Sequence, residues 1–369
     1  MNEERITSIT MPKWGMSMDE GIVTSWHIDE GAEVTQGQEV VDVESTKIAN
    51  AIESKKSGLL RRRVAQVGQT FPVGALLGVI ADRDVEETEI DSFIAKFTIV
   101  ALDDDVGPSG PLPETIQVGS NTIRYIKHGE GGTPVIMVHG FGGDLNAWMF
   151  NQHALAVDRA VYALDLPGHG GSGKLVGSGE LNVLADSVSA IIVESGADYV
   201  HLVGHSLGGA VALLTALNNP GNIKSLTLIS SAGIGQEING NYISGFIAAQ
   251  KRKEMTPVAS LLFSDSRLLS RQMVEDLLRM KRISGVESAL KAIAKANFEG
   301  DHQKIDLLKR QDELNFPVQI LWGEDDAVIP MSHAHNIKAA RTTVISGAGH
   351  MLMMEKASEV NSLLSEFIR

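Results

Sequence analysis

The chain has 369 residues, a formal net charge of −14 at pH 7, 43% hydrophobic residues and no cysteine. This length exceeds that of an ordinary single core, so two domains are expected. The absence of cysteine excludes disulfides, thiolate metal sites and cysteine nucleophiles. The acidic net charge argues against general nucleic-acid binding. No run approaches the ~18 apolar residues of a membrane span and no targeting segment is recognised, so a cytoplasmic location is expected.

Residues 1–82 consist of short strand-like runs separated by glycines, and this pattern repeats after 37 residues. The repeat pairs Gly21 with Gly58, Gly31 with Gly68, Val34 with Phe71, Gly37 with Gly74 and Val40 with Leu77. Glycines that recur at turns indicate that the same positive-φ bends are made twice. The repeat therefore predicts two β halves, packed face to face as a small flattened barrel.

A single lysine lies in the connection between the two halves. The segment 44–47, Glu-Ser-Thr-Lys, must reverse the chain between the strand that ends at Val43 and the one that begins near Ile48. Lys47 is therefore expected at a hairpin tip. Taken alone, such a lysine would be interpreted as a solvated surface residue, and the duplicated frame around it is what suggests a function.

Residues 5–82 resemble lipoyl domains. The resemblance is carried by Met11-Pro12 to Glu20-Gly21, by Gly31-x-x-Val-x-x-Gly37, by the segment that ends in Lys47, and by Ser57-Gly58. It implies that a lipoate ligase joins lipoate to Lys47 through an amide, which gives a long arm with a redox-active dithiolane. Related biotin-carrying domains usually have methionine on both sides of the lysine, whereas Thr46 and Ile48 flank it here, so lipoate is favoured over biotin.

Residues 83–115 are predicted to be an acidic linker, with nine acidic and two basic residues and a net charge of −7. Within it, Ile90, Phe93, Ile94 and Phe97 have the i, i+3, i+4, i+7 spacing of a short amphipathic helix. Two alternatives are open: the helix docks a partner subunit, or it packs against the chain's own domains. The one compact basic run, residues 61–63, is expected to form an exposed strand face.

From residue 116 to residue 369, continuous apolar runs alternate with helical stretches. The runs are residues 134–138, 160–164, 199–203, 226–229, 318–321 and 343–345. Buried runs separated by helices predict an α/β fold with a mostly parallel sheet covered on both faces. Residues from about 235 to 314 have helical periodicity and few strand signals, which predicts an inserted helical cap.

A serine motif follows the predicted strand at 199–203. The segment 204–208 reads Gly-His-Ser-Leu-Gly and is followed by an Ala- and Leu-rich helix, which is the strand-turn-helix context of a nucleophile elbow around Ser206. Such a serine needs an acid and then a histidine downstream. Asp326 and His350, each just past a predicted strand, fit these roles; Asp325 is the fallback acid, and Asp326 is preferred for its Gly-x-x-Asp-x-x-x-Pro spacing.

A tetrahedral intermediate also needs hydrogen-bond donors for its negative charge. The glycine-rich segment 139–143 follows a predicted strand, so the backbone N–H groups of Phe141 and Leu207 are the expected oxyanion hole. His139 and His205 are interpreted as positioning backbone rather than carrying protons. His333 and His335 follow no acidic cluster suited to a metal and are expected at the surface, so no metal site is predicted.

The motifs of residues 116–369 resemble those of α/β-hydrolases, and the combination with a lipoyl domain resembles the acyltransferase components of bacterial acetoin-cleaving dehydrogenase systems. This resemblance implies a thiamine-diphosphate-dependent partner that cleaves acetoin and acetylates the lipoyl arm. It also implies coenzyme A as the acceptor of the acetyl group, and a flavin-containing dihydrolipoamide dehydrogenase that reoxidises the dithiol.

The chain departs from the acyltransferase components of 2-oxoacid dehydrogenases, because it lacks their His-x-x-x-Asp-Gly motif and an obvious peripheral-subunit-binding domain. Our hypothesis is that Ser206 takes the acetyl group and releases it to coenzyme A. Two alternatives are a serine esterase or thioesterase tethered to a carrier, and a non-enzymatic carrier and scaffold. The sequence leaves a homo-oligomer open.

Overall fold

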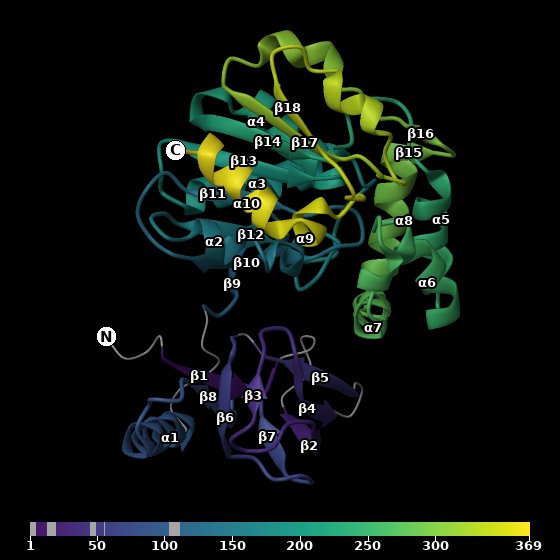
Figure 1. Ribbon diagram of the computed structural model, residues 1–369. Coiled ribbons are helices and arrows are strands. Elements are labelled where there is room, and N and C mark those ends of the chain that lie inside the picture. Colours follow the sequence, from purple (N-terminus) through teal and green to yellow (C-terminus); the bar gives the residue numbers. More distant parts are fainter. Residues whose placement is uncertain (1–4, 13–19, 45–48, 55, 103–110) are drawn as a thin grey trace. The chain divides into compact units, whose positions relative to one another are not determined.

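The computed structural model describes residues 5–12, 20–44, 49–54, 56–102 and 111–369. The chain divides into two compact units, Met1–Ser109 and Gly110–Arg369 (Figure 1). Among the described residues, none of the helices combines the length and the apolar character that a membrane crossing requires.

Two antiparallel four-stranded sheets form the first unit. One sheet has the order β1 (Ile6–Thr10), β8 (Leu76–Ala81), β6 (Gly58–Arg63), β3 (Glu33–Val34), and the other has the order β5 (Ala49–Glu53), β4 (Glu39–Glu44), β2 (Glu20–Trp26), β7 (Thr70–Pro72). The 37-residue repeat relates β2, β3 and β4 to β6, β7 and β8, so each sheet contains strands of both halves. The predicted all-β first domain is confirmed.

Glycines make the matching turns of the two halves in the same conformation. Gly31 and Gly68 have φ of +83° and +88°, and Gly37 and Gly74 have φ of +82° and +85°. A Cβ built at any of these four would have no described atom within 4 Å. Glycine is therefore required by the backbone conformation, which other residues rarely adopt, and not by a lack of space.

Lys47 lies outside the described residues. The strands on either side of it, β4 and β5, pair antiparallel with Glu44 opposite Ala49. The described residues thus place four residues, 45–48, between the ends of two paired strands.

A helix, α1 (Glu87–Leu102), covers the outer face of β8. All six residues of β8 are buried, because one side faces the barrel core and the other faces the helix. Ile90 is fully buried, and Phe93, Ile94 and Phe97 pack around it. Of the two alternatives for this helix, packing against the chain's own domain is the one the structure shows.

The basic run at 61–63 also contacts this helix, so the expectation of an exposed strand face was wrong. Arg61 Nη2 lies 2.5 Å from Glu87 Oε1 and donates to the backbone carbonyl of Val85, while Nη1 donates to that of Asp82. Arg62 pairs with Glu87 at 2.6 Å. The charges opposite Arg61 and Arg62 come from α1, more than twenty residues downstream, and Arg63 pairs with Asp29, which lies 34 residues upstream. Local sequence patterns could therefore not reveal the cover.

An eight-stranded, mostly parallel sheet organises the second unit. Its order is β18 (Arg341–Ile345), β17 (Val318–Gly323), β14 (Ile223–Ile229), β13 (Val200–His205), β11 (Val135–Val138), β12 (Val161–Leu164), β10 (Asn121–His128), β9 (Glu114–Val118). The pairs from β18 to β12 are parallel, and β10 pairs antiparallel with both β12 and β9. The predicted α/β fold is confirmed.

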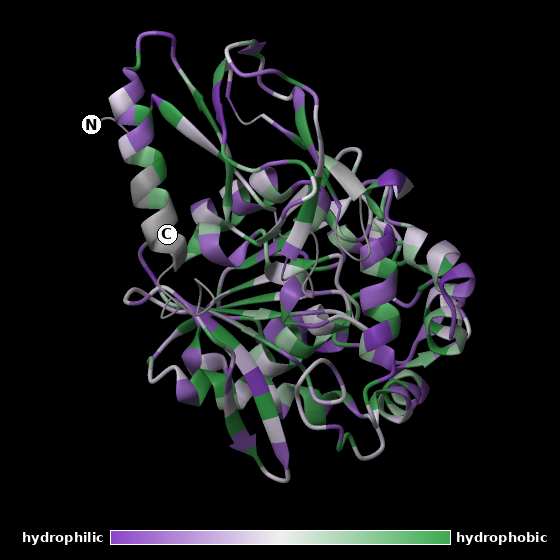
Figure 2. Ribbon diagram, turned by 90° about the horizontal axis from the view of Figure 1, so that it is seen from below, coloured by the Kyte–Doolittle hydropathy of each residue, from purple (hydrophilic) through white to green (hydrophobic). Residues whose placement is uncertain are grey.

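Helices cover both faces of this sheet, and α10 crosses its near face in Figure 1. They are α3 (Leu181–Glu194) and α4 (Leu207–Asn218) on one face, and α2 (Gln152–Leu155), α9 (Leu352–Glu355) and α10 (Ala357–Phe367) on the other. On β11, Ile136 and Val138 join the first core while Val135 and Met137 join the second. Strands buried on both faces appear as hydrophobic stretches inside the unit (Figure 2).

The segment predicted as a cap contains four helices between β14 and β17, grouped at one side of the second unit in Figure 1. They are α5 (Gly240–Ala248), α6 (Arg252–Ser260), α7 (Arg271–Lys281) and α8 (Val286–Asn297), followed by a short hairpin of β15 (Phe298–Glu299) and β16 (His302–Gln303). Their buried residues belong to the same hydrophobic core as α3 and α4.

Candidate active site

Ser206 lies at a strained turn between β13 and α4. Its φ of 54° and ψ of −123° are unusual for a residue with a side chain, and its exposed fraction is 6%. A Cβ at Gly208 would lie 2.2 Å from the carbonyl oxygen of His139, and a Cβ at Gly204 would lie 2.4 Å from that of Gly208. The motif therefore needs glycine on both sides of the serine because other backbone approaches too closely.

Backbone hydrogen bonds hold this turn in place. Ser206 N donates to the carbonyl of Ile229 at 3.0 Å, and the Ser206 carbonyl accepts from Gly209 and Ala232 at 2.9 and 3.0 Å. The serine is thus tied to the neighbouring strand β14 and to its own helix. These hydrogen bonds hold Ser206 in its unfavourable backbone conformation.

His350 and Asp326 form a buried pair past the ends of β18 and β17. His350 Nδ1 donates to Asp326 Oδ2 at 2.8 Å, and the two side chains are 1% and 0% exposed. Asp326 Oδ1 accepts from the backbone N–H groups of Val328 and Ile329 at 2.8 and 3.0 Å. Both carboxylate oxygens are therefore occupied by donors.

Burial alone would raise the pKa of Asp326, but the charge and hydrogen bond of His350 and the two backbone donors outweigh it, so this pKa lies below its ordinary value. An ionised Asp326 holds the proton of His350 on Nδ1. His350 Nε2 has no hydrogen-bond partner within the described part of the chain and is free to accept a proton. The arrangement is that of a general base with its orienting acid.

The neighbouring acid, Asp325, faces a different group. Its Oδ2 accepts from Ser264 Oγ at 2.7 Å. Of the two candidate acids, the one bonded to the imidazole of His350 is therefore Asp326.

His205 links the serine turn to the triad histidine. Its Nε2 donates to the backbone carbonyl of His350 at 3.0 Å, and the two ring centroids are 4.7 Å apart. Burial holds the pKa of His205 well below its ordinary value, so the ring is neutral. The residue beside Ser206 thus contacts His350 directly, which brings the serine turn and the Asp326–His350 pair together.

The loop expected to form the oxyanion hole lies against Ser206. A Cβ at Gly140 would be 2.9 Å from the Cβ of Ser206. Leu207 begins α4, and within the described residues neither its backbone N–H nor that of Phe141 donates a hydrogen bond. Two free donors beside a serine can bind a developing oxyanion.

His139 fixes this loop as a neutral ring. Its Nδ1 donates to the carbonyl of Gly140 at 2.8 Å, and its Nε2 accepts from the backbone N–H of Leu166 at 3.0 Å. Burial lowers its pKa. Both ring nitrogens are therefore used in holding backbone.

Two cavities of the second unit, about 690 and 490 Å³, lie elsewhere: Ser206, Asp326 and His350 line neither of them. The three candidate residues are instead enclosed, since Ser206 and His350 have exposed fractions of 6% and 1% and the side chain of Asp326 is 0% exposed.

Over nearly its whole length, the chain is similar to two bacterial proteins. It is 46% identical over 368 residues to the dihydrolipoyllysine-residue acetyltransferase component of the acetoin cleaving system of Pseudomonas putida, covering 99% of each chain. It is 42% identical over 364 residues to the protein of the same name from Cupriavidus necator, covering 98% of this chain and 97% of that one. The chain belongs to this family of acetyltransferase components.

The separate units agree with this family. Residues 7–80 match a family model described as a biotin-requiring enzyme, of the biotin and lipoyl type, and residues 133–357 match one described as the alpha/beta hydrolase fold. A meta-cleavage product hydrolase from Pseudomonas fluorescens has the same fold, with 22% identity and a TM-score of 0.63, covering 69% of this chain and 96% of that one. For this family, the first match supports covalent lipoate as the carried group.

One prediction about the acetyltransferase component was wrong: His333 is not at the surface. It is 2% exposed, and its Nε2 lies 2.7 Å from Glu237 Oε2. A Cβ at Gly235 would lie 2.3 Å from the ring of His333. The ring therefore fits only because residue 235, about a hundred positions earlier, is a glycine. His335 is exposed, as expected.

Sequence reasoning also missed the cap residues that contact the oxyanion loop. Tyr242 and Phe246 of α5 pack against Phe141, which lies about a hundred positions earlier. Helical periodicity predicts that such residues are buried, but it does not say what they contact.

Proposed function

We propose that the chain carries an acetyl group on lipoylated Lys47 and passes it to coenzyme A through Ser206. A lipoyl group on Lys47 would supply a dithiol able to hold acetyl as a thioester. The described residues around it suit a carrier, because paired strands flank the connection and rigid glycine turns support them. The observation that carries the proposal is the buried Asp326–His350 pair beside the strained serine.

In the first half of the reaction, Ser206 Oγ attacks the carbonyl carbon of an acetyl thioester while its proton passes to His350 Nε2. The oxyanion is bound by the backbone N–H groups of Phe141 and Leu207. The carbon–sulfur bond then breaks, and His350 returns the proton to the leaving thiolate. Acetyl-Ser206 and a free thiol result.

In the second half, the thiol of coenzyme A loses its proton to His350 and attacks acetyl-Ser206, and the serine oxygen leaves with that proton. Acetyl-CoA and free Ser206 are formed. Asp326 keeps the imidazole in the required tautomer throughout. Because acetyl-serine also reacts with water, transfer needs a dry site, and the 6% exposure of Ser206 and 1% exposure of His350 support this.

The remaining assignments are proposals too, and the relatives' place in an acetoin cleaving system supports the partners among them. We propose a carrier domain at 1–82, a connecting segment at 83–115, and a catalytic domain at 116–369 with its cap at about 235–314. We also propose a thiamine-diphosphate-dependent acetoin-cleaving partner, dihydrolipoamide dehydrogenase, lipoate ligase and a cytoplasmic location. Helix α1 of the connecting segment belongs to the first compact unit.

One assay separates this function from its two alternatives. Lipoylated protein is incubated with the acetylating partner and coenzyme A, and wild type is compared with Ser206→Ala. Loss of acetyl-CoA in the variant supports transfer through the serine. Serine-dependent release of free acetate instead supports a tethered hydrolase, and unchanged acetyl-CoA formation leaves the carrier and scaffold alternative.

Lys47 is tested separately by intact mass. Protein produced with lipoate available should show a lipoyl increment that is absent in Lys47→Ala. A biotin increment, or no increment in the wild type, would overturn the carrier assignment.

A further inference from the structure

Helix α5 of the cap packs directly on the loop that holds one proposed oxyanion donor. Gly142, next to Phe141, has a φ of +71°, and a Cβ there would lie 2.4 Å from the ring of Phe246. Phe246 is fully buried, and its ring meets that of Phe141 edge-on with centroids 5.9 Å apart. The path of the loop is therefore bounded by a side chain of the cap.

A second residue of α5 holds the same loop from one turn earlier. Tyr242 Oη donates to the backbone carbonyl of Phe141 at 3.4 Å, and its ring lies 6.0 Å from that of Phe246. The ring of Phe298, just past α8, meets that of Phe141 edge-on with centroids 6.2 Å apart. Phe141, whose N–H is the proposed oxyanion donor, is thus contacted by three aromatic residues of the cap.

A buried lysine of α7 fixes the end of α5 that carries Phe246. Lys281 is 5% exposed, and its Nζ donates to the carbonyls of Phe246 at 2.6 Å, Ile247 at 3.0 Å and Ala249. The ammonium also lies 5.6 Å from the centroid of the Phe246 ring. A cation on the last carbonyls of a helix stabilises that end, and all three of its donors are used.

We infer that Tyr242 and Phe246 are positioning residues for the oxyanion hole, and that Lys281 holds Phe246 in place. The N–H of Phe141 then stabilises the oxyanion only while the cap is packed against the loop. The cap thereby controls the rate of the chemical step as well as enclosing the substrate. This inference rests on the proposed function, which makes Ser206 the nucleophile and Phe141 a donor.

The test measures catalysis and transition-state binding together in the full-length lipoylated protein. The substrate is p-nitrophenyl acetate, and the probe is phenylboronic acid, which forms a tetrahedral adduct on a serine hydroxyl. Active sites are counted from the acylation burst. A misplaced donor weakens the tetrahedral state more than it weakens ester binding, since removing one donor altogether costs about 10²–10³ in kcat.

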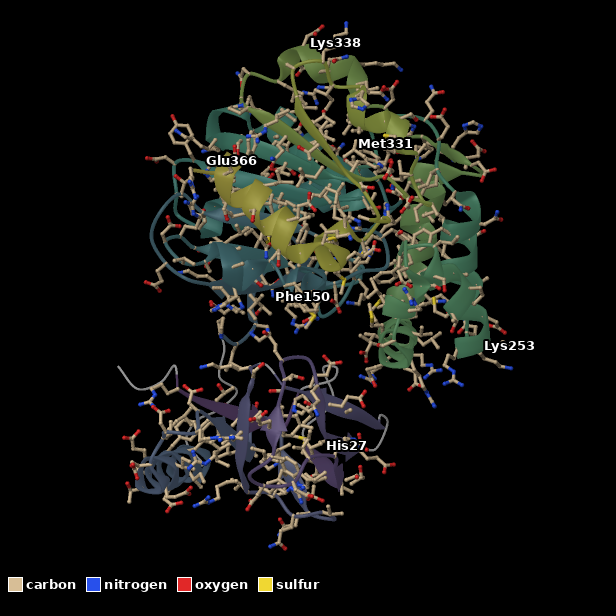
Figure 3. The ribbon with its side chains drawn as sticks, viewed as in Figure 1. His27, Phe150, Lys253, Met331, Lys338 and Glu366 are labelled. Carbon is tan, nitrogen blue, oxygen red and sulfur yellow. The ribbon has the colours of Figure 1, made fainter. Side chains whose placement is uncertain are left out.

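Phe246→Leu should lower kcat about 10- to 100-fold per active site, raise the boronate Ki by a similar factor, and change KM less than about threefold. Lys281→Met should act in the same direction, by about tenfold. The control is Lys253→Met, at an exposed residue near the outer end of the cap (Figure 3), and it should leave all three quantities unchanged.

A variant that merely unfolds in part would show fewer active sites with an unchanged boronate Ki, and that result in both Phe246→Leu and Lys281→Met would overturn the inference. Tyr242→Phe removes one hydroxyl and should fold, so it provides an independent check with an expected loss of about threefold in kcat and boronate affinity. If Ser206→Ala retains the burst, the proposed function fails. If the serine is required but Phe246→Leu and Tyr242→Phe have wild-type kcat and Ki, the positioning inference alone fails.

Discussion

The two units place positive-φ backbone on different residues. In the described part of the first unit, positive φ occurs at glycine alone, as at Gly31 and Gly68, where the conformation costs little. In the second unit it occurs also at Ser206 and Ser230, with φ of 54° and 43°. The first unit thus uses glycine wherever its described backbone has positive φ, whereas the second unit has this conformation at two serines, one of which is the candidate nucleophile.

Their titratable groups differ as well. The first unit has one histidine, His27, whose side chain is 38% exposed. The second unit buries His139, His169 and His205 around the candidate active site as neutral rings. A carrier needs stability and an accessible attachment point, whereas a catalytic site needs oriented groups shielded from water. The four predictions below test this contrast.

The largest effect is expected at the triad acid. Asp326→Asn removes the charge that holds the proton of His350 on Nδ1, so kcat for acetyl transfer should fall about 10⁴-fold while lipoylation of Lys47 is unaffected. The measurement is steady-state acetyl-CoA formation together with intact mass. The matched control, Asp325→Asn, removes a charge that faces Ser264 and not His350, keeps an oxygen able to accept from Ser264 Oγ, and should stay within about threefold. A larger loss in the control would reverse the assignment of the acid.

The next effect concerns the helix that closes the first unit. Ile90 is fully buried between α1 and β8, so Ile90→Ala should lower the free energy of unfolding of the first unit by about 2–5 kcal/mol. Calorimetry of the full chain should show one transition shifted and the other unchanged. Val67→Ala is the control, because Val67 is 59% exposed and should change stability by less than about 0.5 kcal/mol. Equal shifts of this unfolding transition in Ile90→Ala and Val67→Ala would show that the packing of α1 does not stabilise the first unit.

Local conformational rules explain which features the sequence predicts well. Gly31, Gly37 and their partners in the repeat mark turns because few other residues adopt positive φ, and Ser206 is recognisable because its flanking glycines are required by close backbone. Features that depend on distant contacts were missed. The burial of His333 depends on the space left by Gly235, and the cover over Arg61 and Arg62 depends on charges in α1.

The candidate site shows the same division. The order of Ser206, acid and histidine follows from the motif, but the choice between Asp325 and Asp326 is decided by the path of one loop around His350. The contact of Phe246 with Phe141 has no local signature, since it joins residues about a hundred positions apart. These contacts are tertiary, and short-range patterns do not encode them.

A third prediction uses pH to separate the units. Burial lowers the pKa of His201 to about 4 and that of His169 to about 3, whereas an unfolded histidine titrates near 6.5. Between pH 6.5 and the native pKa the unfolded chain binds more protons, so the second unit loses stability as pH falls, by about 1.4 kcal/mol per pH unit for each histidine.

From pH 7.5 to pH 5, His201 alone should account for about 2 kcal/mol of this loss, and urea unfolding of the second unit at both pH values measures it. His201→Gln keeps a side chain able to bond Ser225 Oγ and should reduce the loss by that amount. The first unit is the internal reference for the pH dependence, because its one histidine, His27, has a side chain that is 38% exposed. An unaltered pH dependence in the variant would show that His201 is not buried in its neutral form.

The smallest effect tests the geometry of the ion pairs that hold α1. The Arg61 side chain is 12% exposed, and its planar guanidinium divides its hydrogen bonds between two nitrogens: Nη1 donates to the carbonyl of Asp82, and Nη2 donates to the carbonyl of Val85 and to Glu87. The single nitrogen of a lysine ammonium does not reproduce this planar fork. Arg61→Lys keeps the charge and should lower the free energy of unfolding of the first unit by about 1 kcal/mol. Arg83→Lys is the control, because the side chains of Arg83 and Glu33 are each 80% exposed and such exposed ion pairs contribute little to the free energy of unfolding. A loss of the same size in both variants would mean that charge alone, rather than the fork of hydrogen bonds, fastens the helix to the carrier.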